Sequence, residues 1–156
     1  MSNAKVEYRP SLLERISGPN AVPLTALVKK GEVAAEKVQE SFGDYLGTRL
    51  RDLADVRYRL SGAPDEASGA VWDQFYSLVV DLRGSAAMAG RQGLGEVCTS
   101  LETLLKEHAR DARAAQVAAS HVDTLVLLSS GHEGPAAVKR LSAELVQAVA
   151  RIPRRF

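Results

Sequence analysis

Apolar residues recur at three- and four-residue steps through most of the chain, a spacing that places them on one face of an α-helix. The first run predicts a long amphipathic helix over residues 32–61, closed by Ser61-Gly62 and Pro64. The second predicts a helix over residues 66–90. The apolar positions are Val38, Phe42, Tyr45, Leu46, Leu50, Leu53, Val56 and Leu60 in the first run, and Val71, Phe75, Leu78, Leu82 and Ala86 in the second.

Three more helices are predicted over residues 92–109, 112–130 and 135–151. Their stripes are Leu94, Val97, Cys98, Leu101, Leu104 and Leu105; then Ala118, Val122, Leu125 and Val126; then Val138, Leu141, Leu145, Val149 and Ile152. No segment alternates apolar and polar residues as a strand does, and short connections place consecutive helices antiparallel. The predicted fold is therefore all-α, an antiparallel four-helix bundle with an additional C-terminal helix.

The first 31 residues differ from the rest. They contain Pro10, Pro19, Pro23 and the turn-forming sequence SGPN at 17–20, and each proline discourages a long helix through it. We expect a partly irregular arm with one helical turn at SLLERI, residues 11–16. The predicted domain organisation is an N-terminal arm, residues 1–31, followed by a helical bundle domain, residues 32–156.

The composition is that of an ordinary soluble globular domain, with 156 residues of which 46% are hydrophobic and 25% charged. No run of about 18 apolar residues is present that would cross a membrane. The N-terminus lacks the charged and apolar segments of a secretion signal. The single cysteine, Cys98, rules out an intrachain disulfide, so a cytoplasmic location is expected.

Charge is distributed unevenly along the chain. Residues 1–31 hold five Lys or Arg against two Glu, and the last six residues hold three Arg, which leaves the middle at about −5. We interpret the basic ends as docking on the acidic body of the same chain or as solvated. Nucleic acid is not an expected partner, because no basic stripe with interleaved aromatic residues is present.

The motifs of catalytic and cofactor-binding sites are missing. The sequence has no Cys or His pair at metal-ligand spacing, no P-loop and no Gly-x-Ser-x-Gly, so neither a metal nor a cofactor is expected. The sequence GRQGLG at 90–95 follows a helix rather than a strand, which argues against a phosphate-binding loop. Structural roles are favoured for the three histidines, His108, His121 and His132.

The helix predicted over 66–90 has an unusual outer face. With about 100° per residue, its apolar stripe falls within roughly 80°, and Val80 lies almost opposite the centre of that stripe. Tyr76, Arg83, Gly84, Ala87 and Arg91 share this outer face. Glycine inside a helix costs about 1 kcal/mol relative to alanine, so Gly84 needs a compensating reason.

Residues 79–107, VVDLRGSAAMAGRQGLGEVCTSLETLLKE, resemble the histidine phosphotransfer (HPt) family, whose motif reads His-x-Leu-Lys-Gly-Ser before small residues, a glycine and a later Leu-Glu pair. Arg83 stands in place of the lysine, and Val80 stands at the phosphoacceptor position. The positions that agree with the motif are Leu82, Gly84, Ser85, Gly90, Leu101 and Glu102.

The resemblance implies a binding partner for this chain and the absence of the family's phosphotransfer reaction. In this family the phosphorylated aspartate of a receiver domain approaches an exposed histidine, and a glycine one turn away leaves room for it. A valine side chain accepts no phosphoryl group. We therefore predict a non-enzymatic module of a bacterial two-component phosphorelay that docks a receiver domain or histidine kinase without transferring phosphate. The predicted partner-binding residues are Tyr76, Val80, Arg83, Gly84, Ala87 and Arg91.

Three alternatives stay open at this point. An active phosphocarrier would use another histidine, of which His121 is the least implausible. A scaffold or oligomerisation bundle would bind its partner through the arm or the last helix. The outer face would otherwise be a surface no longer used for binding, with Val80 a lone exposed apolar residue. The identity of the partner and the oligomeric state are not predicted.

Overall fold

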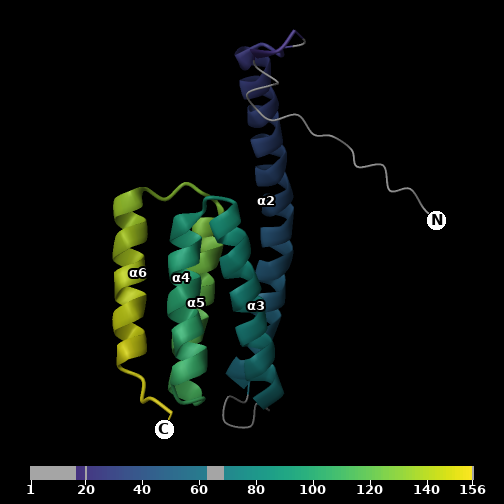
Figure 1. The fold of residues 1–156 in the computed structure, drawn as a ribbon. Helices are drawn as coiled ribbons and strands as arrows, with labels where there is room; N and C mark the ends of the chain where they lie inside the picture. Colours follow the sequence, from purple (N-terminus) through teal and green to yellow (C-terminus); the bar gives the residue numbers. More distant parts are fainter. Residues whose placement is uncertain (1–16, 20, 63–68, 156) are drawn as a thin grey trace, which may run out of the picture. The chain divides into compact units, whose positions relative to one another are not determined.

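The computed structural model describes residues 17–19, 21–62 and 69–155. These residues form five α-helices, α2 (Leu24–Gly62), α3 (Gly69–Met88), α4 (Gln92–Glu107), α5 (Ala112–Ser129) and α6 (Pro135–Ala150) (Figure 1). Contacts within the chain divide it into two units, residues 1–39 and 40–156. The predicted all-α bundle with an additional C-terminal helix is confirmed. Within the described ranges, no helix has the length and apolarity needed to cross a membrane.

Helix α2 begins at Leu24, earlier than the predicted start at residue 32. Pro23 lies just before it, and its carbonyl accepts hydrogen bonds from the backbone N–H groups of Ala26 and Leu27 at 2.9 and 3.2 Å. A proline at a helix start loses nothing, because the N–H that it lacks would have no partner there. The helical turn predicted at residues 11–16 lies outside the described residues.

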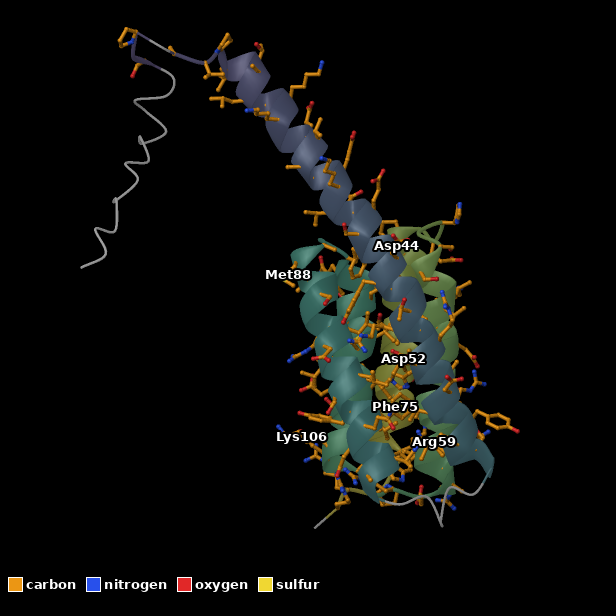
Figure 2. All side chains as sticks on the ribbon, turned by 90° about the vertical axis from the view of Figure 1, so that its right-hand side faces the viewer. Asp44, Asp52, Arg59, Phe75, Met88 and Lys106 are labelled. Atoms are coloured by element: carbon orange, nitrogen blue, oxygen red, sulfur yellow. The ribbon has the colours of Figure 1, made fainter. Side chains whose placement is uncertain are left out.

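The bundle core of the second unit is formed by residues 40–62 of α2 together with α3, α4, α5 and α6. Helix α2 contributes six buried apolar residues, Phe42, Leu46, Leu50, Leu53, Val56 and Leu60. Phe75 of α3 is fully buried and lies inside the bundle in Figure 2. Arg59 of α2 donates a hydrogen bond to Gln74 of α3 at 3.0 Å. The spacing read from the sequence therefore locates most of the core, although Val38, predicted on the apolar stripe of the same helix, is 54% exposed.

The buried face of α3 is wider than predicted. Trp72 and Val79 are buried, at 2% and 0% exposure, whereas the predicted core residue Val71 is only half-buried. On α5, Val126 was predicted to face the core but is 50% exposed. The helical period fixes an apolar stripe only to within about one residue, and packing against the neighbouring helices decides between candidates at its edges.

Helix α6 packs against both α4 and α5, beside α4 in Figure 1. Its approach to α4 depends on Gly93, because a Cβ atom added there would lie 2.6 Å from Cγ1 of Val138 on α6. Such a distance is far below van der Waals contact, so the glycine is what allows the two helices to meet.

The segment after α6 returns to the end of α4. The backbone N–H of Ala109 donates to the carbonyl of Pro153 at 2.8 Å, and that of Arg155 donates to Glu107 at 2.9 Å. The Arg155 guanidinium donates to the carbonyls of Leu105 and Lys106 at 2.9 and 2.7 Å. A cation on the last carbonyls of a helix satisfies unpaired acceptors and complements the helix dipole. The interpretation that the basic C-terminal segment docks on its own chain agrees with these contacts.

We predict opposite effects on stability for two glycines of the same helix. Gly93→Ala should lower the free energy of unfolding by about 1–3 kcal/mol, because Val138 must move to admit the new methyl group. Gly95→Ala should raise it by up to about 1 kcal/mol, since a Cβ atom there meets nothing within 4 Å. Urea denaturation of both variants measures the two effects.

Adding Val138→Ala to Gly93→Ala provides the internal check. The truncation removes the atom that clashes, so the double variant should recover part of the stability that Gly93→Ala loses. Additive losses in the double variant would show that the α4–α6 approach is not limited by this contact.

Candidate functional site

Five of the predicted partner-binding residues form one strip of α3, which we call the α3 flank: Tyr76, Val80, Arg83, Gly84 and Ala87. Arg83, Gly84 and Ala87 are exposed, whereas Tyr76 and Val80 are half-buried. Val80 was expected almost opposite the core. Because Trp72 and Val79 are buried, the core-facing side of α3 extends farther around the helix than predicted. Val80 therefore lies at the margin of the core rather than opposite the core.

Gly84 occupies an open position of the α3 flank. A Cβ atom added to it would meet no atom within 4 Å apart from its own helix and chain neighbours. Packing against another helix therefore does not explain the glycine, although glycine costs about 1 kcal/mol at such a position. One helical turn from Val80, it leaves the surface beside the valine bare.

A groove of about 590 Å³ runs between α3 and α4, and we call it the α3–α4 groove. Its lining residues are Arg83, Gly84, Ala87, Gly90, Arg91, Gln92, Gly95, Glu96 and Thr99. The sequence reasoning missed the contribution of α4. A usable signal was present, because Gly95 and Thr99 are small residues one turn apart, on the side of α4 away from its apolar stripe.

Two arginines line the α3–α4 groove, and both are engaged with other parts of the chain. Nε of Arg83 lies 3.0 Å from Oε2 of Glu102 on α4, in a pair whose side chains are 44% and 18% exposed. Arg91 donates hydrogen bonds to the carbonyl oxygens of Leu128 and Ser129 at 3.0 and 3.4 Å. Arg91 therefore stabilises the C-terminal end of α5 rather than extending the α3 flank.

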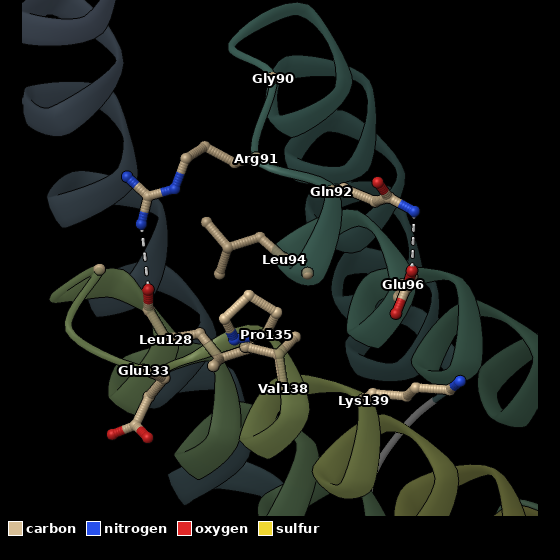
Figure 3. Close-up of a pocket in the computed structure, with 12 residues that line it drawn as sticks. Gly90, Arg91, Gln92, Leu94, Glu96, Leu128, Glu133, Pro135, Val138 and Lys139 are labelled. Carbon is tan, nitrogen blue, oxygen red and sulfur yellow. Dashed lines mark hydrogen bonds between the residues drawn. The ribbon is translucent and has the colours of Figure 1, made fainter.

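A second hollow, of about 660 Å³, lies on the other side of the turn at residues 90–92 (Figure 3). Leu94, Leu128, Pro135 and Val138 form its apolar part, and Arg91, Glu96, Glu133 and Lys139 its charged part. Gly90 shapes the turn between the two hollows with a φ of +68°, a conformation that glycine adopts without strain. No sequence pattern had indicated this hollow.

The single cysteine lies inside the bundle, on α4. Cys98 is fully buried, and burial raises the pKa of its thiol to about 12. The charges of Arg83 and Glu102 also act on it, in opposite directions. At neutral pH the thiol is protonated and closed off from solvent, so it has no role as a nucleophile.

None of the three histidines lies on α3, the helix that carries the α3 flank. His121 is fully buried on α5, where its Nδ1–H donates to the carbonyl of Val117 at 2.8 Å. Nε2 accepts a hydrogen bond from the Ser100 hydroxyl at 2.9 Å, because Nδ1 already carries the single proton of the neutral ring. His108 is buried and donates from Nδ1 to the carbonyl of Ile152 at 2.7 Å, whereas His132 is exposed in the loop before α6.

Burial argues directly against the alternative in which His121 carries the phosphoryl group. Desolvation lowers the pKa of His121 to about 4, although its hydrogen bond to Val117 acts in the opposite direction. The aspartate of a partner does not reach a side chain with no exposed surface and with both ring nitrogens bonded. Across the described residues, no group of three or more His, Cys, Asp or Glu side chains is arranged to hold a metal ion.

The fold and this surface define a class of protein, an up-and-down helical bundle that exposes a strip of small and apolar residues on its second bundle helix. The sequence model of the Hpt domain matches residues 38–151, which is most of the chain, so the protein belongs to the Hpt domain family. Hpt domains take part in two-component phosphorelays, which makes this chain a signalling module of that system. No match is found among curated proteins or among solved structures.

The buried histidine predicts a specific pH dependence of stability. The pKa of His121 is about 4 in the folded protein and near 6.5 in the unfolded chain, so between these values only the unfolded chain binds the proton. The free energy of unfolding should therefore fall as the pH decreases from about 6.5 to about 4, by at most about 1.4 kcal/mol per pH unit from this group. Denaturant titrations across this range measure the slope.

A pair of variants separates His121 from the other titrating groups. His121→Gln should flatten the slope between pH 4 and 6.5, even if it lowers stability at every pH. His132→Gln changes an exposed loop residue and should leave the slope as it is. An unchanged slope in His121→Gln would assign the pH dependence to other groups.

Proposed function

We propose that this protein is a non-transferring Hpt module, which docks a receiver domain or a histidine kinase and acts by occupancy. Its residue at the family's phosphoacceptor position is Val80, whose side chain has no atom that accepts a phosphoryl group. His108 directly follows α4, His121 lies on α5 and His132 lies in the loop before α6, so that none of the three histidines lies on α3, which supports the same conclusion. The proposal places the protein in the cytoplasm, in agreement with its single buried cysteine.

The observation that carries the proposal is the open glycine beside the valine. Gly84 is exposed, meets no neighbour and is costly in a helix, so the structure of the bundle itself gives no reason for it. A partner that approaches α3 closely supplies such a reason. Tyr76 and Val80, each half-buried, would then form the apolar centre of a small interface, with the exposed residues of the α3 flank at its edge.

The proposed interface is small and transient. Signalling interfaces of this kind often bury less than about 1,200 Å² in total, so a few side chains determine whether binding occurs. A single large side chain placed at Gly84 is therefore enough to test the site.

We predict that the wild-type protein neither accepts nor donates phosphate in a relay assay, and that Val80→His creates an acceptor. The new imidazole would stand one turn from the open Gly84, at a position with part of its surface exposed. Acid-labile label transferred from phosphorylated receivers of the same organism measures the gain. If the folded variant stays unlabelled by all of them, the docking surface is not that of a receiver.

Substitutions at Gly84 should separate stability from binding. Gly84→Ala should raise the free energy of unfolding by up to about 1 kcal/mol. Gly84→Gln should keep or raise the melting temperature, because glutamine is a good helix former, while weakening partner binding by blocking the approach over Val80. A thermal melt and a binding titration on the same sample measure both effects.

The matched control is Gly43→Gln, which changes an exposed glycine of α2 that also has no neighbour within 4 Å. It should leave partner binding intact. Loss of folding in Gly84→Gln would mean that Gly84 is packed, and retained binding would place the docking surface elsewhere on the chain.

A further inference from the structure

The part of α2 that belongs to the first unit, residues 24–39, is exposed to solvent along its whole length. Every residue from 21 to 41 is exposed except Leu27, which is half-buried. Ten large hydrophobic side chains are exposed among the described residues, and half of them lie in this short segment: Val22, Leu24, Val28, Val33 and Val38. Within the described ranges, nothing covers this apolar helix segment.

Most of its apolar residues share one face of the helix. At about 100° per residue, they fall within an arc of roughly 120° that contains no charged or polar side chain. We call this arc the α2 apolar face, and it consists of Leu24, Leu27, Val28, Gly31, Ala34, Ala35 and Val38. Val33 lies on the opposite side of the helix, among the charged residues. An apolar face of this width is the kind that a helix packs against a neighbour.

Small residues occupy the middle of the α2 apolar face. Gly31 is exposed, and a Cβ atom added to it would meet no atom within 4 Å apart from its own helix and chain neighbours. Glycine is unfavourable inside a helix, so packing within the chain gives no reason for it. With Ala34 and Ala35 beside it, Gly31 lets a second helix approach the backbone closely, while the larger side chains pack around the crossing.

The two edges of the α2 apolar face carry opposite charges. Glu32 and Glu36 follow one edge, and Lys30 and Lys37 follow the other. All four side chains are exposed, and in the part of the chain that the structure describes none of them forms a salt bridge. When two copies of such a helix pack face to face in parallel, the acidic edge of each meets the basic edge of the other. An antiparallel pair would bring acid against acid and base against base.

We infer that the α2 apolar face binds the same face of a second copy of this chain, with the two helices parallel and crossing near Gly31. Apolar side chains of both copies then leave solvent, and the lysines of each edge lie near the glutamates of the other copy. The charges favour a second copy over another occupant because the surface is complementary to itself. A helix of this length is marginal in water without packing, so pairing also stabilises it.

The inference does not rest on the docking function, because α2 carries no residue of the α3 flank. Where both hold, a pair of chains presents two α3 flanks. A partner that is itself paired would then bind more tightly by engaging both.

Sedimentation velocity on the full chain over a range of concentrations tests the inference. The wild-type protein should pass from the mass of one chain to that of two as the concentration rises. Raising the ionic strength to about 0.15 M should weaken the pair, because its edges attract each other. The mass of one chain at every concentration up to about 1 mM, where even weak pairing is seen, overturns the inference. Pairing that becomes stronger over this range of salt also overturns it.

A matched pair of variants tests the α2 apolar face. Val38→Glu places a carboxylate in this face, opposite the same carboxylate of the second copy, and should raise the dissociation constant at least about tenfold. Val33→Glu makes the same change on the opposite side of the helix and should alter it by no more than about twofold. The two valines are 54% and 45% exposed, so neither change reaches the bundle core. An equal effect of both variants, or none in Val38→Glu, overturns the inference.

Charge exchange tests the edges and remains informative if Val38→Glu fails to fold. Lys30→Glu with Lys37→Glu makes both edges acidic, and Glu32→Lys with Glu36→Lys makes both basic. Each double variant alone should lose most of its pairing, whereas an equal mixture of the two should recover it. Double variants that pair as the wild type does, or a mixture that recovers nothing, would show that these edges do not direct the pairing and overturn the inference.

Discussion

Helix α4 packs against three neighbours at once, α3, α5 and α6, and the rest of the bundle is arranged around this constraint. Two specific contacts add to apolar packing in setting the register of α4 against its neighbours. Gly93 lets α6 approach through Val138, and Ser100 reaches across the core to the imidazole of His121. Satisfied polar contacts of this kind in a core favour one arrangement of the helices over its neighbours in register.

The position of α4 also explains the character of the candidate site. With α5 and α6 covering its other sides, α4 presents to α3 the strip that carries Gly95 and Thr99, and this strip completes the α3–α4 groove. Glu102 lies farther along the same helix and holds Arg83 in its ion pair. Two of the small residues that line the groove and the carboxylate that pairs with Arg83 therefore come from the same helix. Membership in the Hpt domain family gives this surface its context in two-component signalling.

Periodicity alone predicts the existence, order and approximate ends of the helices, and it places most of the core. It is less informative at the edges of a stripe, as Trp72 and Val79 on α3 and Val126 on α5 show. It also places the start of α2 too late, because Pro23 precedes the helix instead of interrupting it. The α3–α4 groove was not predicted, although the small residues Gly95 and Thr99 indicate the side of α4 that lines it. The contacts that Arg83 and Arg91 make depend on how separate helices pack against one another, and no local sequence pattern specifies those contacts.

Cys98 has a practical consequence because it is the only thiol of the chain. It is fully buried on α4, where the charges of Arg83 and Glu102 act on it. A thiol reagent therefore reacts only when the packing of α4 opens, and the rate of that reaction reports how often it does. Thiol modification of the native protein therefore measures local opening of the core, close to the surface proposed to bind a partner.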